Sequence, residues 1–174
     1  MPVPPFIVEL RRLVGTRQLW LPAVTAVVLR GGAGDGPGAG EGGGECGGEV
    51  LLTRRADNGA WSPVTGILDP GEEAAVGAAR ETLEETGVEV SVDRLVSVGV
   101  TPPVVHAGGD RAIYLDLTFA CSHVAGEARV ADDENLEVRW WPLDDLPPMD
   151  HWLRQRIDDV LAGETATRYR QRPS

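Results

Sequence analysis

Alternating and periodic apolar positions divide the chain into a short series of predicted helices and strands. Helical spacing of apolar side chains is found over residues 5–14 and again over residues 150–163, where a glycine ends the pattern. Runs rich in valine, leucine and threonine, which are typical of strands, cover residues 19–30, 49–55, 94–102, 112–121 and 137–143. Strands on both sides of a central helix, followed by a terminal helix, predict a mixed α/β domain.

A glycine-dominated segment, GGAGDGPGAGEGGGECGG, separates the first two predicted strands. It has no periodicity and too few apolar side chains to offset the entropy of ordering it, so we predict a flexible hairpin loop over residues 31–48. A glycine-rich phosphate loop would open a helix, whereas a strand follows here. Residues from about 164 to 174 are predicted to form a frayed tail. At 174 residues, the chain suits one domain.

The central helix is predicted over residues 72–86. Asp69 to Gly71 form the turn before it, and Glu72 and Glu73 suit the positive end of the helix dipole. Gly87 is a natural stop, because glycine readily adopts the left-handed conformation that ends many helices.

One face of this helix is predicted to be buried and the opposite face to carry acidic side chains. At about 100° per residue, the stripe that we expect to face the core is made of Ala75, Val76, Ala79, Thr82 and Leu83. Glu81, Glu84 and Glu85 fall on the other side, with Arg80 able to pair with Glu84 at i,i+4. Glu81 and Glu85 repel each other by about 0.2–0.5 kcal/mol.

Two interpretations of this acidic cluster are open from the helix alone. It is either a solvated surface, which most charge runs are, or a site at which a hard divalent cation removes the repulsion. Mg²⁺ and Mn²⁺ prefer carboxylate and carbonyl oxygens, and Mg²⁺ keeps several waters that a phosphate can displace. The cluster contains neither histidine nor cysteine, so zinc and copper are disfavoured.

Composition narrows the class of protein further. The formal net charge of −11 argues against a protein that binds nucleic acid polymers, whereas a small anionic substrate remains compatible if a cation reverses the local field. Two cysteines without a CxxC motif give no support for zinc or a disulfide framework, so a cytoplasmic location is expected. The apolar run LWLPAVTAVVL loosely resembles a signal peptide but is too short to span a bilayer, so no membrane association is predicted.

The residues around the glutamates carry a resemblance to a known family. Eight of them fit the spacing G-x5-E-x7-R-E-U-x-E-E-x-G-U, where U is a bulky aliphatic residue: Gly66, Glu72, Arg80, Glu81, Glu84, Glu85, Gly87 and Val88. This resembles the signature of the Nudix hydrolases. Thr82 departs from it, and Pro63 to Thr65 replace the leucine-proline-glycine-glycine turn common in the family. The resemblance extends over roughly residues 19–147.

The resemblance implies the Nudix fold, a mixed sheet sandwiched between helices (α/β/α), and a Mg²⁺-dependent activity with Mn²⁺ as an alternative. Glu81 and Glu85 would be the main metal ligands, Glu84 would assist, and the Gly66 carbonyl would complete the site. Arg80 would hold the carboxylates through charge-assisted hydrogen bonds, and Glu72 would brace the junction of loop and helix.

The hydrolysis implied by the family also requires a base for the attacking water. Glu134, in an acidic loop before a predicted strand, occupies a place where some family members supply a glutamate. Asp133 and Glu137 are neighbouring candidates, and Glu81 is another. The alternative for Glu134 is an ordinary acidic turn residue.

Candidate substrate contacts rest on residue type and position. Arg54 and Arg55 could clamp a phosphate, because a guanidinium matches its geometry, and Trp61 or Tyr114 could stack on a base. The alternative for each is a surface arginine or a core aromatic residue. His106 and Arg111 lie in a loop that could line the same pocket, and His151 is expected at the surface.

The leading hypothesis is a pyrophosphohydrolase that cleaves a nucleoside diphosphate linked to another moiety, such as a nucleoside triphosphate, ADP-ribose or a dinucleotide. A non-catalytic nucleotide-sensing module is the alternative from another class. Isoprenoid diphosphate isomerisation, also found on this fold, would need a cysteine near the glutamates, and Cys46 and Cys121 are poorly placed for it. The expected partner is a small nucleotide derivative, and a homodimer is compatible with the family.

Overall fold

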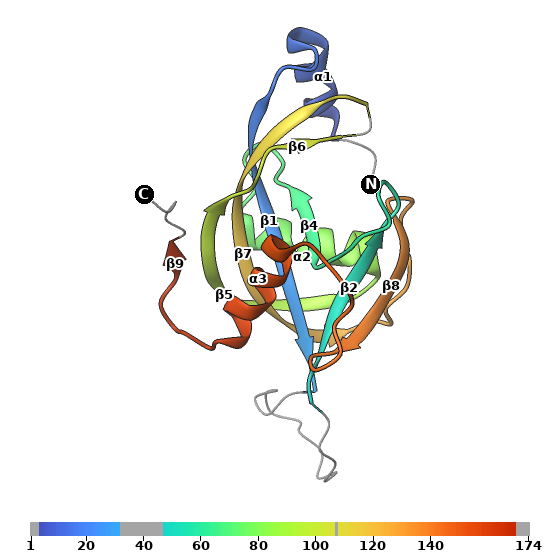
Figure 1. The fold of residues 1–174 in the computed structure, drawn as a ribbon, viewed down its shortest axis with the longest axis vertical. Helices are drawn as coiled ribbons and strands as arrows, with labels where there is room; N and C mark the ends of the chain where they lie inside the picture. The colour runs from blue at the N-terminus through green and yellow to red at the C-terminus, as the bar shows by residue number, and fades with distance from the viewer. Residues whose placement is uncertain (1–3, 32–46, 107, 170–174) are drawn as a thin grey trace.

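The computed structural model describes residues 4–31, 47–106 and 108–169, in which helices lie on both faces of a mixed sheet (Figure 1). The helices are α1 (Pro5–Val14), α2 (Ala74–Thr86) and α3 (His151–Leu161). The strands are β1 (Leu19–Arg30), β2 (Glu49–Arg55), β3 (Trp61–Ser62), β4 (Val64–Ile67), β5 (Glu89–Val100), β6 (Val104–Val105), β7 (Arg111–Ala125), β8 (Asn135–Pro142) and β9 (Arg168–Tyr169). The predicted α/β/α class is confirmed.

Strand β1 organises the sheet, because it pairs along one edge with β7 and along the other with two different strands. The β1–β7 pairing is parallel and runs from Leu19 opposite Ala112 to Leu29 opposite Ser122. On the other edge, the middle of β1, residues 23–26, pairs antiparallel with β4 and its last two residues pair with β2. Strand β2 continues to β3 and β8, and β7 continues to β5 and then β9. Strand β4 therefore leads directly from the centre of the sheet into the turn before α2.

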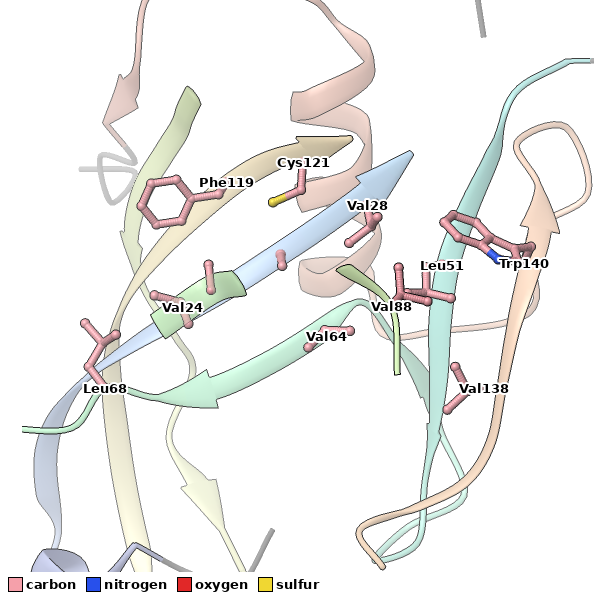
Figure 2. Close-up of a cluster of buried hydrophobic side chains, with 12 residues drawn as sticks. Val24, Val28, Leu51, Val64, Leu68, Val88, Phe119, Cys121, Val138 and Trp140 are labelled. Carbon is pink, nitrogen blue, oxygen red and sulfur yellow. The ribbon is translucent and has the colours of Figure 1, made fainter. Parts of the chain in front are cut away.

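Two hydrophobic clusters fill the space between the sheet and its helices. The α2-side core contains Val24, Val28, Leu51, Val64, Ala78, Phe119, Val138 and Trp140, most of which are labelled in Figure 2. The α3-side core contains Val27, Val50, Leu52, Ala120, Ile157 and Val160. Neighbouring residues of β1 and β2 alternate between the two clusters, as side chains of a strand alternate between the faces of a sheet. The sheet thus separates α2 and its glutamates from α3.

Most predicted elements are confirmed, and the differences lie at their ends. Helix α2 begins at Ala74 instead of residue 72, so Glu73 is its N-cap residue, with an extended backbone. Gly87 ends the helix in the left-handed conformation, with φ 69°, as predicted. Within the tail predicted to fray, residues 168 and 169 form β9, which pairs with β5, and residues 170–174 lie outside the described part of the chain. The predicted flexible loop lies almost wholly outside the described residues.

The predicted buried face of α2 is correct at Thr82, which is fully buried, but wrong at its large apolar residues. Val76 and Leu83, which were expected to face the core, are 59% and 48% exposed, whereas Glu81 and Glu85 are only 4% and 7% exposed. The other residues on the buried face are small, namely Gly77, Ala78, Thr82 and Thr86. Their size lets the helix approach closely, since a Cβ added at Gly77 would lie 2.4 Å from Leu68 Cδ2. Close packing by small side chains therefore determines which way α2 faces.

Candidate active site

Two threonines on the buried face of α2 keep their hydroxyls hydrogen-bonded within the helix. The hydroxyl of Thr82 donates to the Ala78 carbonyl at 2.8 Å, and that of Thr86 donates to the Thr82 carbonyl at 2.5 Å. Both hydroxyls are therefore satisfied within the helix while fully buried. Thr82, the departure from the family spacing, is accommodated in this way.

Gly66 on β4 lies directly against the Glu81 side chain. A Cβ built on Gly66 would come within 2.1 Å of Glu81 Cδ and 2.3 Å of Oε1, which no side chain permits. Glu81 consequently occupies the space that glycine leaves free. Gly66 on β4 and Glu81 on α2 are therefore adjacent. The sequence predicted that these two residues share a site.

Arg80 holds three carboxylates at once. Its Nε and Nη2 donate to the two oxygens of Glu72 at 2.7 and 2.8 Å, a bidentate pair. Its Nη1 donates to Glu81 Oε1 and to Glu84 Oε2, both at 3.0 Å. Glu72 Oε2 also accepts from the backbone N–H of Asp69 in the turn before the helix, at 3.1 Å. The contacts expected of Arg80 and of Glu72 are both present.

Burial governs the electrostatics of the two inner glutamates. Loss of hydration raises the pKa of Glu81 to about 7, even though Arg80 opposes the shift. Burial likewise raises the pKa of Glu85 to about 8, against a hydrogen bond from Asn135, and the neighbouring Glu81, Asp132 and Glu134 add to it. By contrast, the hydrogen bonds from Arg80 hold the pKa of Glu72 below its usual value. The pair Glu81 and Glu85 is therefore short of positive charge.

An acidic loop, residues 126–134, lies across the C-terminal end of α2. The backbone N–H groups of Arg129 and Ala131 donate to the carbonyls of Thr86 and Glu85 at 3.0 and 3.2 Å. Glu134, at the end of this loop, is exposed, and its charge raises the pKa of both inner glutamates. The structure thus places Glu134 beside the site.

The rival bases predicted from the sequence are arranged differently. Glu137 on β8 lies opposite Arg54 of β2 and within 3.9 Å of Arg139. Asp133 is exposed within the loop. Asn135 was not predicted from the sequence, and its amide donates to Glu85 Oε2 at 3.0 Å. An asparagine after three acidic residues looks like a turn, so only the folded contact reveals it.

The predicted substrate contacts separate into two groups. Arg55 lies near the glutamates. Its hydrogen bond with Asp57 is the largest cause that raises its pKa, and the nearby charges of Glu85 and Glu134 add to this effect. Trp61 instead packs on the α3-side core, edge to face with Trp141 at 5.2 Å. Arg54 pairs with Trp61 across the strands and donates to the Gly59 carbonyl at 3.2 Å. The structure does not bring Arg54 or Trp61 to the glutamates.

Tyr114 and His106 lie together near Arg55. The ring nitrogen of His106 is 2.9 Å from the Tyr114 hydroxyl, and the two rings meet edge to face. Burial raises the pKa of Tyr114, and Arg11 and Arg55 oppose the shift. The hydrogen bond from Arg55 lowers the pKa of Asp57, and His106 adds to the lowering. Tyr114, His106 and Asp57 form a polar group beside Arg55 that sequence reasoning found only in part.

The remaining candidates lie on the outside. Arg111 is exposed at the start of β7, and its carbonyl accepts from Arg11 of α1 at 2.8 Å. His151 is exposed at the start of α3, as predicted. Across the described ranges, no three histidine, cysteine, aspartate or glutamate side chains are grouped as ligands of one metal ion. Glu81 and Glu84 are held by Arg80, and Glu85 by Asn135.

Comparison with known proteins identifies the class to which this fold and site belong. The family model of the NUDIX domain matches residues 41–161, so the chain belongs to the Nudix family and is a Nudix hydrolase. A MutT-like protein from Streptomyces ambofaciens is 36% identical over 115 residues, which cover 66% of this chain and 69% of that protein. The NAD-capped RNA hydrolase NudC of Pseudomonas aeruginosa is 36% identical over 104 residues, 58% of this chain but only 34% of NudC.

Solved structures show the same fold at low sequence identity. The MutT protein from Methanosarcina mazei Go1 superposes with a TM-score of 0.61 at 20% identity, covering 86% of this chain and 98% of that chain. An ADP-ribose pyrophosphatase from Streptococcus suis gives a TM-score of 0.58 at 18% identity, covering 86% and 96%. In the described part of the chain, no helix is long and apolar enough to cross a membrane.

Proposed function

We propose that this Nudix hydrolase is a divalent-cation-dependent pyrophosphohydrolase that cleaves a nucleoside diphosphate linked to another moiety. The observation that carries the proposal is the pair of buried carboxylates on α2, Glu81 and Glu85, of which Glu81 lies against Gly66. Among the described residues neither has a full counter-charge: Arg80 gives Glu81 part of its bonds, and Glu85 receives a neutral amide. Buried charges of this kind are normally paired or coordinate a metal.

The residues present fit a hard cation such as Mg²⁺ or Mn²⁺. Carboxylate oxygens are its preferred donors, and Gly66 leaves the room that Glu81 occupies. Glu81 and Glu85 would hold the ion, with Glu84 assisting and the Gly66 carbonyl completing the set. When bound, Mg²⁺ supplies charge that screens the phosphates and stabilises the leaving oxygen.

The side chains around this pair have separate roles in the proposal. Arg80 keeps the carboxylates in place through its bonds to Glu72, Glu81 and Glu84. Glu134, exposed beside the buried pair, is the proposed base that takes a proton from the attacking water, and Glu81 is the alternative. In-line attack at phosphorus then separates the two phosphates of the diphosphate bridge.

On the substrate side, Arg55 is the proposed phosphate contact, because it lies near Glu85 and Glu134 and a guanidinium can bind a phosphate bidentately. Tyr114 is the proposed aromatic contact for a base. Relatives and structural neighbours whose names refer to NAD-capped RNA and to ADP-ribose support a diphosphate flanked by a nucleoside. The panel that tests the proposal therefore contains nucleoside triphosphates, ADP-ribose and dinucleotides.

The first prediction concerns Glu85. Replacing it with glutamine, Glu85→Gln, removes a proposed ligand while keeping the shape, so we expect kcat on the best panel substrate to fall at least about 10²-fold. Hydrolysis is measured with and without Mg²⁺, after circular dichroism shows that the variant is folded. The matched control is Glu89→Gln, an exposed glutamate just beyond the helix, which should hydrolyse at the wild-type rate.

Two outcomes would contradict the proposal. Near-normal turnover by Glu85→Gln would show that Glu85 is not a ligand of the catalytic cation. Tight binding of ADP-ribose without hydrolysis of any panel member at saturating Mg²⁺ would favour a nucleotide-sensing module instead.

A further inference from the structure

Asn135, the first residue of β8, joins α2 to the acidic loop through a single amide group. Its Nδ2 donates to Glu85 Oε2 at 3.0 Å and to Asp132 Oδ1 at 3.3 Å. An amide NH₂ carries two N–H donors, which matches these two acceptors. The residue is 7% exposed, so neither bond is readily replaced by water.

A local irregularity in the sheet turns Asn135 inward. Across β2 and β8, Arg54 lies opposite Glu137 and Arg55 opposite Asn135, so Leu136 is an extra residue without a partner on β2. Strict alternation from the buried Val138 would put Leu136 inside. Instead Leu136 is 57% exposed, and Asn135 takes the inner position. Bulges of this type re-aim a side chain next to a site.

The backbone at the same point is tied to the strand that carries the proposed phosphate contact. The carbonyl of Glu134 accepts from the N–H of Ala56 at 2.7 Å, immediately after Arg55. Asn135 therefore stands where three parts of the site meet: its side chain reaches α2 and the acidic loop, and its strand neighbours Arg55.

The Asn135 amide links α2 to the acidic loop, and because it is neutral it also leaves the charge of Glu85 unchanged. An arginine here would orient Glu85 but would also neutralise it, as Arg80 partly does for Glu81. The amide orients the carboxylate and adds no charge, so the negative charge of Glu85 stays available to a cation. It also separates the carboxylates of Glu85 and Asp132, which repel each other.

We propose that Asn135 is a positioning residue of the hydrolase, which holds the Glu85 carboxylate and the acidic loop in one arrangement and so sets where the loop presents Glu134. This rests on the proposed function. Neighbours that orient metal-binding carboxylates typically contribute 10- to 100-fold to metal affinity or activity.

The test compares Asn135→Ala with wild type in three measurements on the full chain. We expect kcat to fall about 10- to 100-fold while KM for the panel substrate changes less than about threefold. Mn²⁺ binding, followed by the spin-resonance signal of the free ion without substrate, should weaken at least about tenfold. Thermal unfolding reports whether the variant is folded.

Gln155→Ala is the matched control, because Gln155 also donates an amide N–H to a buried carboxylate, Asp159 on α3, at 3.2 Å. It should leave kcat and Mn²⁺ binding at wild-type values. If Asn135→Ala does not fold, Asp132→Ala removes the loop end of the same bridge and should lower kcat in the same direction.

Three outcomes separate a failure of the positioning role of Asn135 from a failure of the proposed hydrolase function. Asn135→Ala with kcat and Mn²⁺ binding within about threefold of wild type would overturn the positioning role, and so would equal losses in Gln155→Ala. If wild type hydrolysed no panel member, the proposed function would fail. The Mn²⁺ titration would then still decide whether Asn135 positions Glu85.

Discussion

At the scale of single residues, the site depends on one position that has no side chain. Gly66 and Glu81 approach so closely that no other amino acid fits at residue 66 without moving the glutamate. The requirement is one of space, since the Gly66 backbone is that of an ordinary β strand paired with Val24 of β1. Glycine in a strand often marks such a close approach.

The corresponding prediction is that Gly66→Ala both destabilises the protein and inactivates it. The added methyl displaces Glu81, so we expect about 1–3 kcal/mol of lost unfolding free energy in urea and kcat at least about 10²-fold lower. Gly47→Ala, where a Cβ would meet no atom within 4 Å, is the control and should be neutral. The double variant Gly66→Ala/Glu81→Ala should regain stability without activity. If it stayed as unstable as the single variant, the clash would not be with Glu81.

Residue spacing was enough to predict the identity of the inner glutamates, Arg80 and Gly66, because their positions in the chain are those of the family signature. Their burial was not predictable in the same way. Periodicity arguments place apolar side chains inside, so Val76 and Leu83 were expected in the core and the glutamates at the surface. Asn135 was missed for another reason, since its inward direction depends on an irregular pairing between β2 and β8.

At the scale of elements, α2 is anchored at both ends. At its N-terminal end, the bidentate pair between Arg80 and Glu72 connects the helix to the turn at Asp69. At its C-terminal end, carbonyls of the last turn accept from the acidic loop. Because the glutamates lie between these anchors, their arrangement depends on both.

We predict that Arg80→Lys loosens the first anchor. A lysine ammonium cannot make the bidentate pair with Glu72 and reach Glu81 and Glu84 as well, so we expect kcat to fall about tenfold or more. The unfolding free energy should drop by about 1.5–3 kcal/mol, the value of hydrogen bonds to charged groups. Both are measured at saturating Mg²⁺.

The control for this prediction is Arg154→Lys on α3. Arg154 forms one exposed pair with Asp158 at 2.9 Å, so less than about 0.5 kcal/mol should be lost. Equal losses in the two variants would show that Arg80 is an ordinary surface arginine.

The main elements were predictable because long strands and amphipathic helices have clear periodic patterns. The shortest strands, β3, β6 and β9, have two residues each, and no period can be read from two residues. They form because neighbouring strands supply partners, as β5 does for Arg168 and Tyr169. Tertiary pairing, which a local pattern does not contain, accounts for them.

At the scale of the whole molecule, this acidic protein, with a formal net charge of −11, buries two of its carboxylates, Glu81 and Glu85, on one helix. Burial raises the pKa of Glu81 to about 7 and of Glu85 to about 8, from an ordinary value of 4.5. Between the ordinary and the raised values, the folded state holds protons that the unfolded state has released. The free energy of unfolding of the metal-free protein therefore falls as pH rises through this range.

We accordingly predict that the protein in a chelating buffer is less stable at about pH 8 than at about pH 5, with a slope of up to about 1.4 kcal/mol per pH unit for each glutamate. Urea unfolding across this range measures it. Glu85→Gln should flatten the slope, and excess Mg²⁺ should raise stability most at the alkaline end, because a ligand of the folded state stabilises it. Stability that did not decline with pH in the chelating buffer would contradict the raised pKa values.

The parallel contact of β1 with β7 also bears on how the chain is made. Leu19 pairs with Ala112, so the apolar strand that runs through the centre of the sheet leaves the ribosome long before its principal neighbour exists. At about 5–20 residues per second, the interval is on the order of ten seconds. Strands β2 and β4 are made before β7, so in that interval β1 lacks the partner on one edge only, and an unpaired apolar edge of this kind is prone to aggregation.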